Sequence, residues 1–243
     1  MVLKENMIVI EGLTKDFDSF RAVDNISFNV KKGEVLGFLG PNGAGKSTTM
    51  KMLTGYLPIS SGTASVCGND VTRYPLETKA RIGYLPEGAP LYGDMTTIGL
   101  LNFIAEVRGL SNADKRDKVN LSIKKLQLES VMNQPIETLS KGFKRRVGFA
   151  QAILHDPDVL VLDEPTDGLD PNQKYQVREL IKDMALDKAI IISTHILEEV
   201  EAVCSRAVII SAGRIVFDDT PETLKAKSTS GSLDEVFRKL THK

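Results

Sequence analysis

Residues 40–48 read GPNGAGKST and comprise Gly40, Pro41, Asn42, Gly43, Ala44, Gly45, Lys46, Ser47 and Thr48. This stretch matches the pattern G-x-x-x-x-G-K-[ST], follows an apolar run at residues 35–39 and opens a predicted helix. Its glycines permit a tight loop whose backbone N–H groups point inward, and these donors and the helix N-terminus attract phosphate. We expect Lys46 to reach the β- and γ-phosphates of a nucleotide and the Ser47 hydroxyl to bind Mg²⁺. The alternative is a glycine-rich turn that binds nothing, but the strand before the loop and the helix after it argue against that.

Three short apolar runs, residues 35–39, 159–162 and 189–192, each end at a turn or a polar residue. Runs of this length are typical of strands buried on both faces, as in a parallel sheet. Helical patterns lie between them, so the sequence predicts the βα alternation of a doubly wound α/β sheet. Antiparallel strands are predicted at residues 8–10 with 26–30, joined by a turn-rich segment, and as a hairpin at 207–211 with 214–217.

Helix signals concentrate in the middle and at the end of the chain. Residues 96–154 have few strand signals and three helix-like segments, and they predict a helical insertion. Residues 227–232 (KSTSGS) have the composition of a linker before a short amphipathic C-terminal helix. Helix N-termini are predicted at Ser111 (with Asp114), at Asp170 and Thr220, which both precede a proline, and at Ser232.

The composition of the 243 residues is close to that of an average globular domain, with 42% hydrophobic and 26% charged residues. It excludes disordered, collagen-like and coiled-coil architectures. The 31 basic and 32 acidic residues give a net charge of −1, so we expect no nucleic-acid partner. Cys67 and Cys204 fit neither a disulfide framework nor a zinc site. No run approaches the roughly 20 apolar residues of a membrane span, and the start carries no secretory signal, so we expect a cytoplasmic protein.

An apolar strand that ends in two acids occupies residues 159–164, VLVLDE. Side chains alternate along a strand, so neighbouring acids at its end can take separate tasks. We expect Asp163 to bind Mg²⁺, directly or through water, and Glu164 to polarise the attacking water. Two solvated acids at an ordinary strand end are the alternative, which the presence of a phosphate loop disfavours.

The segment around Ser140 is a weaker candidate for phosphate binding. Ser140 can cap the helix that follows it, and the N-terminus of this helix then attracts an anion beside the flexible Gly142. Taken by itself, the segment is an ordinary helix cap. The basic run Lys144-Arg145-Arg146 can contact a nucleotide or a partner, but we expect it to be a solvated helix face.

Together these segments resemble the ATP-binding cassette (ABC) ATPases, the nucleotide-binding subunits of ABC transporters. Walker A alone occurs in many NTPases, whereas the ordered set found here is specific to the ABC family. A guanine-reading N-K-x-D motif is absent from the sequence, which argues against a P-loop GTPase. The resemblance covers nearly the whole chain: residues 40–48 resemble Walker A, 83–87 (GYLPE) the Q-loop, 139–143 (LSKGF) the signature motif, 160–165 (LVLDEP) the Walker B strand, 168–171 (GLDP) the D-loop and 193–195 (STH) the switch histidine.

The resemblance also implies roles for single residues. Phe17 lies where the family has an aromatic residue that stacks on adenine, although an apolar residue beside a strand is more often part of a core. A neutral His195 would hydrogen-bond the γ-phosphate or the water, with a structural histidine as the alternative. The remaining nucleotide contacts of the family fall on Glu87, Ser140, Gly142 and Asp170, and its metal contacts on Ser47, Asp163 and Glu87.

Two motifs depart from the family pattern. The Q-loop glutamine is Glu87 here, which can still approach Mg²⁺ or the water but adds a charge. The signature L-S-G-G-Q carries Lys141 in place of a glycine and Phe143 in place of the glutamine, while Ser140 and Gly142 remain. Both departures resemble the exporters whose membrane partner is a separate ABC-2-type permease.

The implied fold is a single ABC ATP-binding domain: a RecA-like P-loop core with an antiparallel β piece (1–87 and 157–220), an inserted helical subdomain (88–156) and a short C-terminal helical tail (221–243). The implied activity is hydrolysis of ATP to ADP and phosphate with Mg²⁺. Two copies would form a head-to-tail homodimer, in which Ser140 and Gly142 of one subunit close the site of the other. A separate transmembrane permease would hold the chain at the cytoplasmic face of the membrane. An ABC-type ATPase without a transport role, such as the iron–sulfur assembly type, is the alternative.

Overall fold

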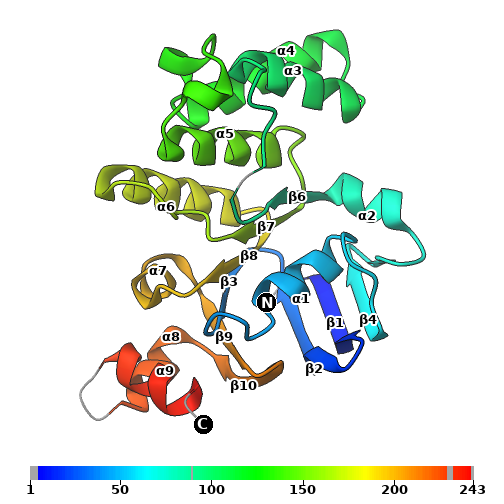
Figure 1. The fold of residues 1–243 in the computed structure, drawn as a ribbon, viewed down its shortest axis with the longest axis vertical. Coiled ribbons are helices and arrows are strands. Elements are labelled where there is room, and N and C mark those ends of the chain that lie inside the picture. The colour runs from blue at the N-terminus through cyan, green and yellow to red at the C-terminus, as the bar shows by residue number, and fades with distance from the viewer. Residues whose placement is uncertain (1–4, 89, 229–231, 242–243) are drawn as a thin grey trace.

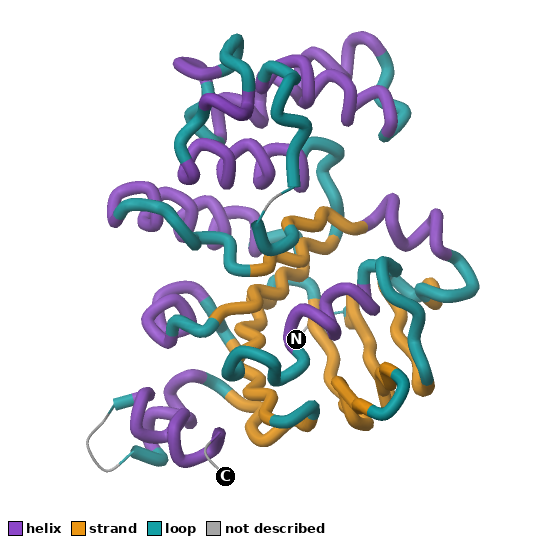
Figure 2. Tube along the Cα trace, viewed as in Figure 1, coloured by secondary structure: helices purple, strands orange, loops and turns teal. Residues whose placement is uncertain are grey.

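The computed structural model describes residues 5–88, 90–228 and 232–241 (Figures 1 and 2). The strands are β1 (Asn6–Phe17), β2 (Phe20–Lys31), β3 (Glu34–Leu39), β4 (Ser61–Val66), β5 (Asn69–Asp70), β6 (Ile82–Leu85), β7 (Val159–Asp163), β8 (Ala189–Thr194), β9 (Arg206–Ser211) and β10 (Arg214–Asp219). The helices are α1 (Lys46–Leu53), α2 (Pro75–Arg81), α3 (Thr97–Val107), α4 (Asn112–Lys125), α5 (Lys141–Ile153), α6 (Pro171–Ala185), α7 (Leu197–Val203), α8 (Pro221–Ala226) and α9 (Leu233–Thr241), with short 3₁₀ turns η1 (Glu129–Val131) and η2 (Ile136–Thr138).

The strands form two sheets, one antiparallel and one mostly parallel. The antiparallel sheet has the order β2-β1-β4-β5, and the larger sheet has the order β10-β9-β3-β8-β7-β6. Within the larger sheet, β3, β8, β7 and β6 run parallel. The short apolar runs predict β3, β7 and β8, whereas β6 was not predicted. Leu39 pairs with Thr194 and Asp163 pairs with Ser193, so the carboxyl ends of these strands meet at one edge. The segments that leave this edge begin at Gly40, Pro86, Glu164 and His195.

Strand β7 divides its side chains between two hydrophobic cores. Leu160 and Leu162 pack in the core that contains α5 and α6. Val159 and Val161 point the other way, into the core that contains α1 and the antiparallel sheet. All four side chains have 0% exposure. Because helices or a second sheet cover both faces, this strand is apolar at every position until the site begins at Asp163.

The antiparallel pairing predicted near the start is confirmed, because residues 8–10 of β1 pair with residues 28–30 of β2. The prediction that these strands are short and joined by a turn-rich segment was wrong. β1 and β2 are 12 residues long each, and only Asp18 and Ser19 separate them. The polar and glycine residues that suggest turns lie inside the ladder, which shifts register between Ile10 and Leu13 and again on either side of Lys15. Such β-bulges bend and twist a strand without ending it.

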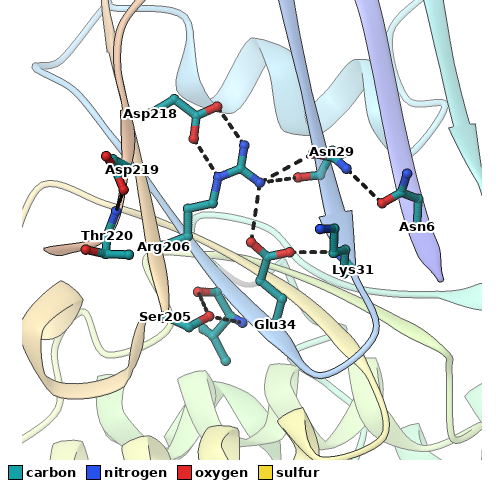
Figure 3. A network of polar contacts seen from close by, with 10 residues as sticks. Asn6, Asn29, Lys31, Glu34, Ser205, Arg206, Asp218, Asp219 and Thr220 are labelled. Atoms are coloured by element: carbon teal, nitrogen blue, oxygen red, sulfur yellow. Dashed lines mark hydrogen bonds and ion pairs between the residues drawn. The ribbon is translucent and has the colours of Figure 1, made fainter. Parts of the chain in front are cut away.

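The predicted late hairpin is present as β9 and β10, which pair antiparallel. Arg206 on β9 joins this hairpin to the first part of the chain (Figure 3). Its guanidinium donates to both carboxylate oxygens of Asp218 at 2.5 and 2.6 Å, to the carbonyl oxygen of Asn29 at 3.0 Å, and to Glu34 at 3.4 Å. Asp218, as the largest cause, and Glu34 raise the pKa of Arg206, while burial opposes them. One side chain thus ties β9 and β10 to β2 and β3.

Between β6 and β7 the chain is helical, with α3, α4 and α5 at one end of the molecule (Figure 1). The three predicted helices are therefore present, whereas the division at residues 88–156 remains a prediction. The N-cap geometry at Ser111 differs from the expected one: its hydroxyl donates to the Asp114 carboxylate at 3.0 Å and makes no side-chain bond to the helix backbone. In the part of the chain that the structure describes, no helix is long and apolar enough to cross a membrane.

The C-terminal part forms a small third core. Thr220 caps α8 by accepting a hydrogen bond from the Thr223 N–H at 3.2 Å. The amphipathic helix predicted after Ser232 is α9, which buries Leu233 and Val236 together with residues of β9 and α7. The predicted linker at residues 227–232 is described only in part, because residues 229–231 lie outside the described residues.

Candidate active site

A cavity of about 410 Å³ opens where the parallel strands end. It unites the phosphate loop with the acids after β7, with the acid after β6, and with the end of the β1–β2 hairpin. Its lining residues are Phe17, Phe20, Ala22, Asn42, Gly43, Gly45, Lys46, Ser47, Thr48, Glu87, Asp163 and Glu164. Segments that are up to 147 residues apart in sequence, from Phe17 to Glu164, therefore face one space.

Two glycines of the phosphate loop are required by close approach of the backbone. A Cβ atom on Gly40 would lie 2.3 Å from the carbonyl oxygen of Ile210, so a side chain there would clash with β9. Gly45 has a φ of +110°, and a Cβ atom there would lie 2.6 Å from the carbonyl oxygen of Ala22. Only glycine adopts this conformation without strain. The loop can therefore wrap tightly before α1 begins at Lys46.

Lys46 is 7% exposed and points back into the loop. Its ammonium group donates to the carbonyl oxygens of Gly40 at 2.6 Å and Pro41 at 3.2 Å. Burial lowers the pKa of Lys46, and the carboxylates of Glu164, Asp163 and Glu87 act in the opposite direction. The cavity thus combines one enclosed cation with three acids, an arrangement that suits a phosphate group together with a second, divalent cation.

Asp163 supplies an orphaned buried oxygen in this cavity. The side chain is 1% exposed, and its Oδ1 accepts a hydrogen bond from the Ser193 hydroxyl. Its Oδ2 has no hydrogen-bond partner among the described residues, which is costly unless a cation or donor meets it. Ser47 and Glu87 line the same cavity. This oxygen donor set fits Mg²⁺, which binds proteins through one or two carboxylates together with substrate phosphates. Within the described ranges, no group of three or more His, Cys, Asp or Glu could hold a metal ion by itself.

Glu164 directly follows β7 in a strained backbone conformation. Its φ is +53°, which is uncommon for a residue with a side chain. Its N–H donates to the carbonyl oxygen of Ser193 at 2.9 Å. Its carboxylate Oε1 lies 2.8 Å from Nδ1 of His195, the residue that follows β8. This geometry places a carboxylate, held by an imidazole, at the edge of the cavity.

The family model described as ABC transporter matches residues 23–167. The chain belongs to this family. Two relatives of the ABC chain are 36% identical to it. The probable multidrug ABC transporter ATP-binding protein YbhF of Escherichia coli K12 aligns over 245 residues, which cover 98% of this chain but only 42% of YbhF. The Nod factor export ATP-binding protein I of Paraburkholderia xenovorans aligns over 236 residues, or 97% of this chain and 78% of that protein.

A solved ABC structure has the same fold. It is titled as an ATP binding subunit of an ABC transporter, shares 28% sequence identity and superimposes with a TM-score of 0.88. The superposition covers 96% of this chain and 99% of that one. The predicted fold class is therefore confirmed: the chain has the α/β, P-loop fold of ABC nucleotide-binding domains.

Several residues predicted for the site do not line the cavity. They are Gly40, Pro41 and Ala44 of the phosphate loop, His195, and the ABC motif residues Ser140, Gly142 and Asp170. Ser140 caps α5, where its side chain accepts a hydrogen bond from the Phe143 N–H at 3.3 Å. Asp170 caps α6 by accepting from the Gln173 N–H at 3.0 Å. Neither of them lines the cavity of its own chain, and Gly142 does not line it either. The predicted helix caps are thus present, while their predicted contact with nucleotide requires a site other than this cavity.

The signature segment of this ABC chain forms an ion pair with the residue that precedes the D-loop segment. Lys141, which stands where the family has a glycine, forms an ion pair with Asp167 at 2.9 Å. This partner is the largest cause of a lowered pKa of Asp167. Both side chains are largely exposed, so the pair contributes little to stability. Its consequence is geometric, because it links the start of α5 to the loop before α6.

The prediction of a solvated face at Lys144-Arg145-Arg146 was wrong. Arg145 is 5% and Arg146 7% exposed. Arg146 lies over the Phe143 ring at 4.3 Å and donates to the carbonyl oxygen of Leu126 at 3.1 Å. A usable signal was the run VGFA that follows at residues 147–150, because four consecutive uncharged residues lie on all sides of a helix and leave this turn of α5 without a solvated face. In such a helix, two adjacent arginines point in different directions and both find acceptors.

Two further residues near the site carry no motif signal. Glu199 in α7 is 2% exposed and accepts hydrogen bonds from the hydroxyls of Thr166 and Thr194, which flank the Glu164 and His195 segments. Burial is the largest cause of its raised pKa.

Phe20 is 61% exposed, pairs across the hairpin with Phe17 and lines the cavity. Phe17 is itself 42% exposed, so the alternative that it belongs to a core is wrong.

Proposed function

We propose that this chain binds and hydrolyses ATP as the ATPase subunit of an ABC exporter whose permease is a separate protein. The observation that carries the proposal is the convergence of Lys46, Asp163 and Glu164 on one cavity, with His195 in contact with Glu164. A phosphate-binding cation, a metal-binding carboxylate and a base are the groups that this reaction requires. The chain spans less than half of the YbhF relative, at 42% of its length, so we take the activity from the site and not from that protein.

Nucleotide binding rests on the phosphate loop and the hairpin end. The N–H groups of the loop and the Lys46 ammonium would hold the phosphates, because both lie at the start of α1. Phe17 lines the same cavity and offers an aromatic surface, and Lys15 lies over its ring at 4.9 Å. Stacking on such a ring would hold the base.

Mg²⁺ would be held by Ser47, Asp163 and Glu87 together with the phosphates of the nucleotide. When bound, the ion supplies positive charge that offsets the charge developing on the phosphate oxygens. The orphaned Oδ2 of Asp163 is the feature of this chain that most supports such an ion. Glu87 in place of glutamine adds a second carboxylate to the donor set.

Hydrolysis would begin when Glu164 accepts a proton from a water molecule beside the γ-phosphate. The water oxygen then bonds to phosphorus, the bond to the β–γ bridging oxygen breaks, and ADP and phosphate leave. General-base help of this kind is worth about 10² to 10⁴ in rate. His195 would hold the Glu164 carboxylate in place through the contact at 2.8 Å.

A complete site would need two subunits. Ser140, Gly142 and Asp170 lie outside the cavity of their own chain, which supports a head-to-tail homodimer in which they reach the nucleotide of the partner. ATP would close this dimer and hydrolysis would open it. The proposed helical subdomain, residues 88–156, would pass this movement to the permease near Glu87, and the permease would hold the chain at the cytoplasmic face of the membrane.

The names of the relatives favour export. One is called a multidrug transporter protein and another a Nod factor export protein. To test the proposal, the tagged chain is isolated with detergent from membranes of its own host, and its partners are identified by mass spectrometry. We expect a protein with several membrane spans. Isolation with iron–sulfur assembly proteins alone would contradict a transport role and support the ATPase without one.

A further inference from the structure

We propose that Arg145 is a positioning residue of the hydrolytic site. Its guanidinium holds the strained backbone of Glu164 through a hydrogen bond to the carbonyl oxygen of that residue. The inference rests on the proposed ATPase function and deepens it, because no sequence motif assigns a role to this residue. Arg145 belongs to α5, the helix that follows Ser140, whereas Glu164 follows β7. The two lie 19 positions apart in sequence and meet through a hydrogen bond.

The Arg145 guanidinium joins three carbonyl oxygens at the site. One terminal nitrogen donates to the carbonyl oxygen of Pro86 at 2.7 Å. The other donates to the carbonyl oxygens of Glu164, at 2.6 Å, and of Asp163. Pro86 is the residue before Glu87, so a single side chain connects α5, the segment after β6 and the segment after β7.

The backbone of Glu164 needs such support. Its φ of +53° is a conformation that persists only when the surrounding structure fixes it. The N–H of Glu164 is held by the carbonyl oxygen of Ser193 at 2.9 Å. The carbonyl oxygen of Glu164 accepts its shorter hydrogen bond from Arg145, at 2.6 Å, and a longer one from the Asp167 N–H, at 3.1 Å. With both backbone groups fixed, the chain turns out of β7 and brings the carboxylate to His195. Strain held in this way at the base indicates a functional requirement and not a packing accident.

Arginine suits this place for a geometric and an electrostatic reason. Its planar fork presents several N–H donors in fixed directions, so it can serve carbonyl groups from two loops at once, which a single ammonium nitrogen does poorly. Burial lowers the pKa of Arg145, and the carboxylates of Asp163, Asp167, Glu164 and Glu87 oppose this effect. An arginine guanidinium stays charged in proteins, so Arg145 offsets part of the negative charge around the cavity.

The experiment compares Arg145→Lys and Arg145→Gln with Arg146→Lys as a matched control. Arg146 is also buried in α5 and donates to carbonyl oxygens, at Leu126 and Gln127, but does not contact Glu164. We expect both Arg145 variants to lose about 10- to 100-fold in kcat, as for a misplaced catalytic group, with ATP affinity within about threefold of the parent. In the Glu164→Gln background, adding Arg145→Lys should lower kcat by less than about twofold, since one residue acts through the other. Arg146→Lys should keep kcat within about threefold.

Hydrogen exchange gives a readout that does not depend on activity. A peptide covering residues 159–168 should exchange faster in Arg145→Lys than in Arg146→Lys, because the Glu164 N–H loses its fixed geometry. Equal exchange in the two variants would overturn the proposal for Arg145. So would an Arg145→Lys substitution that lowers kcat by the same factor in the Glu164→Gln background as in the parent protein. A parent protein without ATPase activity would instead overturn the proposed function, while the exchange comparison still decides what Arg145 holds.

Discussion

His195 Nδ1 lies 2.8 Å from Glu164 Oε1, and this contact joins the segment after β8 to the acid after β7. The Glu164 side chain is 13% exposed and the His195 ring 57%, so the imidazole covers a carboxylate that is otherwise enclosed. A carboxylate held by a ring nitrogen keeps one orientation. Because Glu164 also lines the cavity, the histidine fixes the direction in which this carboxylate faces the cavity.

Replacing His195 by Ala should therefore affect the reaction more than binding. We expect kcat for ATP hydrolysis to fall about 10- to 100-fold, while ATP affinity changes little, since the phosphate loop is untouched. Phosphate release and equilibrium binding measure the two quantities. His155→Gln is the matched control, because His155 lies away from the cavity and bonds to the carbonyl oxygen of Ile82. An unchanged kcat in His195→Ala would make this histidine a structural one.

Lys46→Ala should nearly abolish nucleotide binding. The substitution removes the one ammonium that the phosphate loop encloses and leaves Asp163, Glu164 and Glu87 uncompensated against the phosphates. Titration with a fluorescent ATP analogue measures the loss. Lys51→Ala, in the last turn of the same helix, should bind like the parent protein. If the Lys46 variant and the parent protein bind the nucleotide with equal affinity, the phosphate loop does not bind it in the way proposed here.

The base should be bound with little selectivity. Phe17 and Phe20 are the aromatic side chains that line the cavity, and stacking accepts any base. GTP should therefore be a usable but poorer substrate. Phe17→Ala should weaken the binding of ATP and of GTP by similar amounts, about 1–3 kcal/mol each. Competition binding with both nucleotides tests this. A GTP affinity lower than that of ATP by about a thousandfold, on the order of 4 kcal/mol, would show that a specific reader of the base exists elsewhere.

The stability of the fold should fall as the pH drops below neutrality. Burial, with the nearby Arg108 as a smaller cause, lowers the pKa of His155 from 6.5 to about 4. A lowered folded-state pKa gives stability that is present above pH 6.5 and is lost as the pH falls through about 4, because the unfolded chain takes up the proton first. Between pH 7 and 5, the contribution of His155 to the slope of the unfolding free energy against pH should approach, and not exceed, about 1.4 kcal/mol per pH unit. Denaturant unfolding should give a flatter profile for His155→Gln, and parallel profiles would contradict the assignment.

The sequence predicts the parallel sheet and the phosphate loop because their signals are local. Apolar runs such as residues 159–162 and the GPNGAGKST loop each fit within a few residues. The early hairpin was predicted poorly for a physical reason: bulges at residues such as Gly12 and Asn25, both with positive φ, resemble turns in sequence but continue the ladder.

The supporting residues of the site could not be predicted from motifs. Arg145 and Glu199 act through contacts with backbone or hydroxyl groups of distant segments, and such acceptors leave no pattern in sequence. The charge run at residues 144–146 is typical of a solvated face, and the run VGFA at residues 147–150, which is buried in α5, was the sequence signal against that interpretation. The motif residues of the site were thus predictable from the sequence, and the residues that hold them in place were not.

The most direct test of a site completed by two subunits is the mass of the Glu164→Gln variant, measured by light scattering with ATP and Mg²⁺. The substitution keeps an oxygen acceptor but removes the base and a negative charge next to the γ-phosphate, so ATP should accumulate in a closed dimer that rarely resets. We expect the mass to double, and Ser140→Arg in the same chain should return it to one subunit while ATP still binds. If Glu164→Gln binds ATP but keeps the mass of one subunit at every ATP concentration, two copies of this chain do not close on each other's nucleotide.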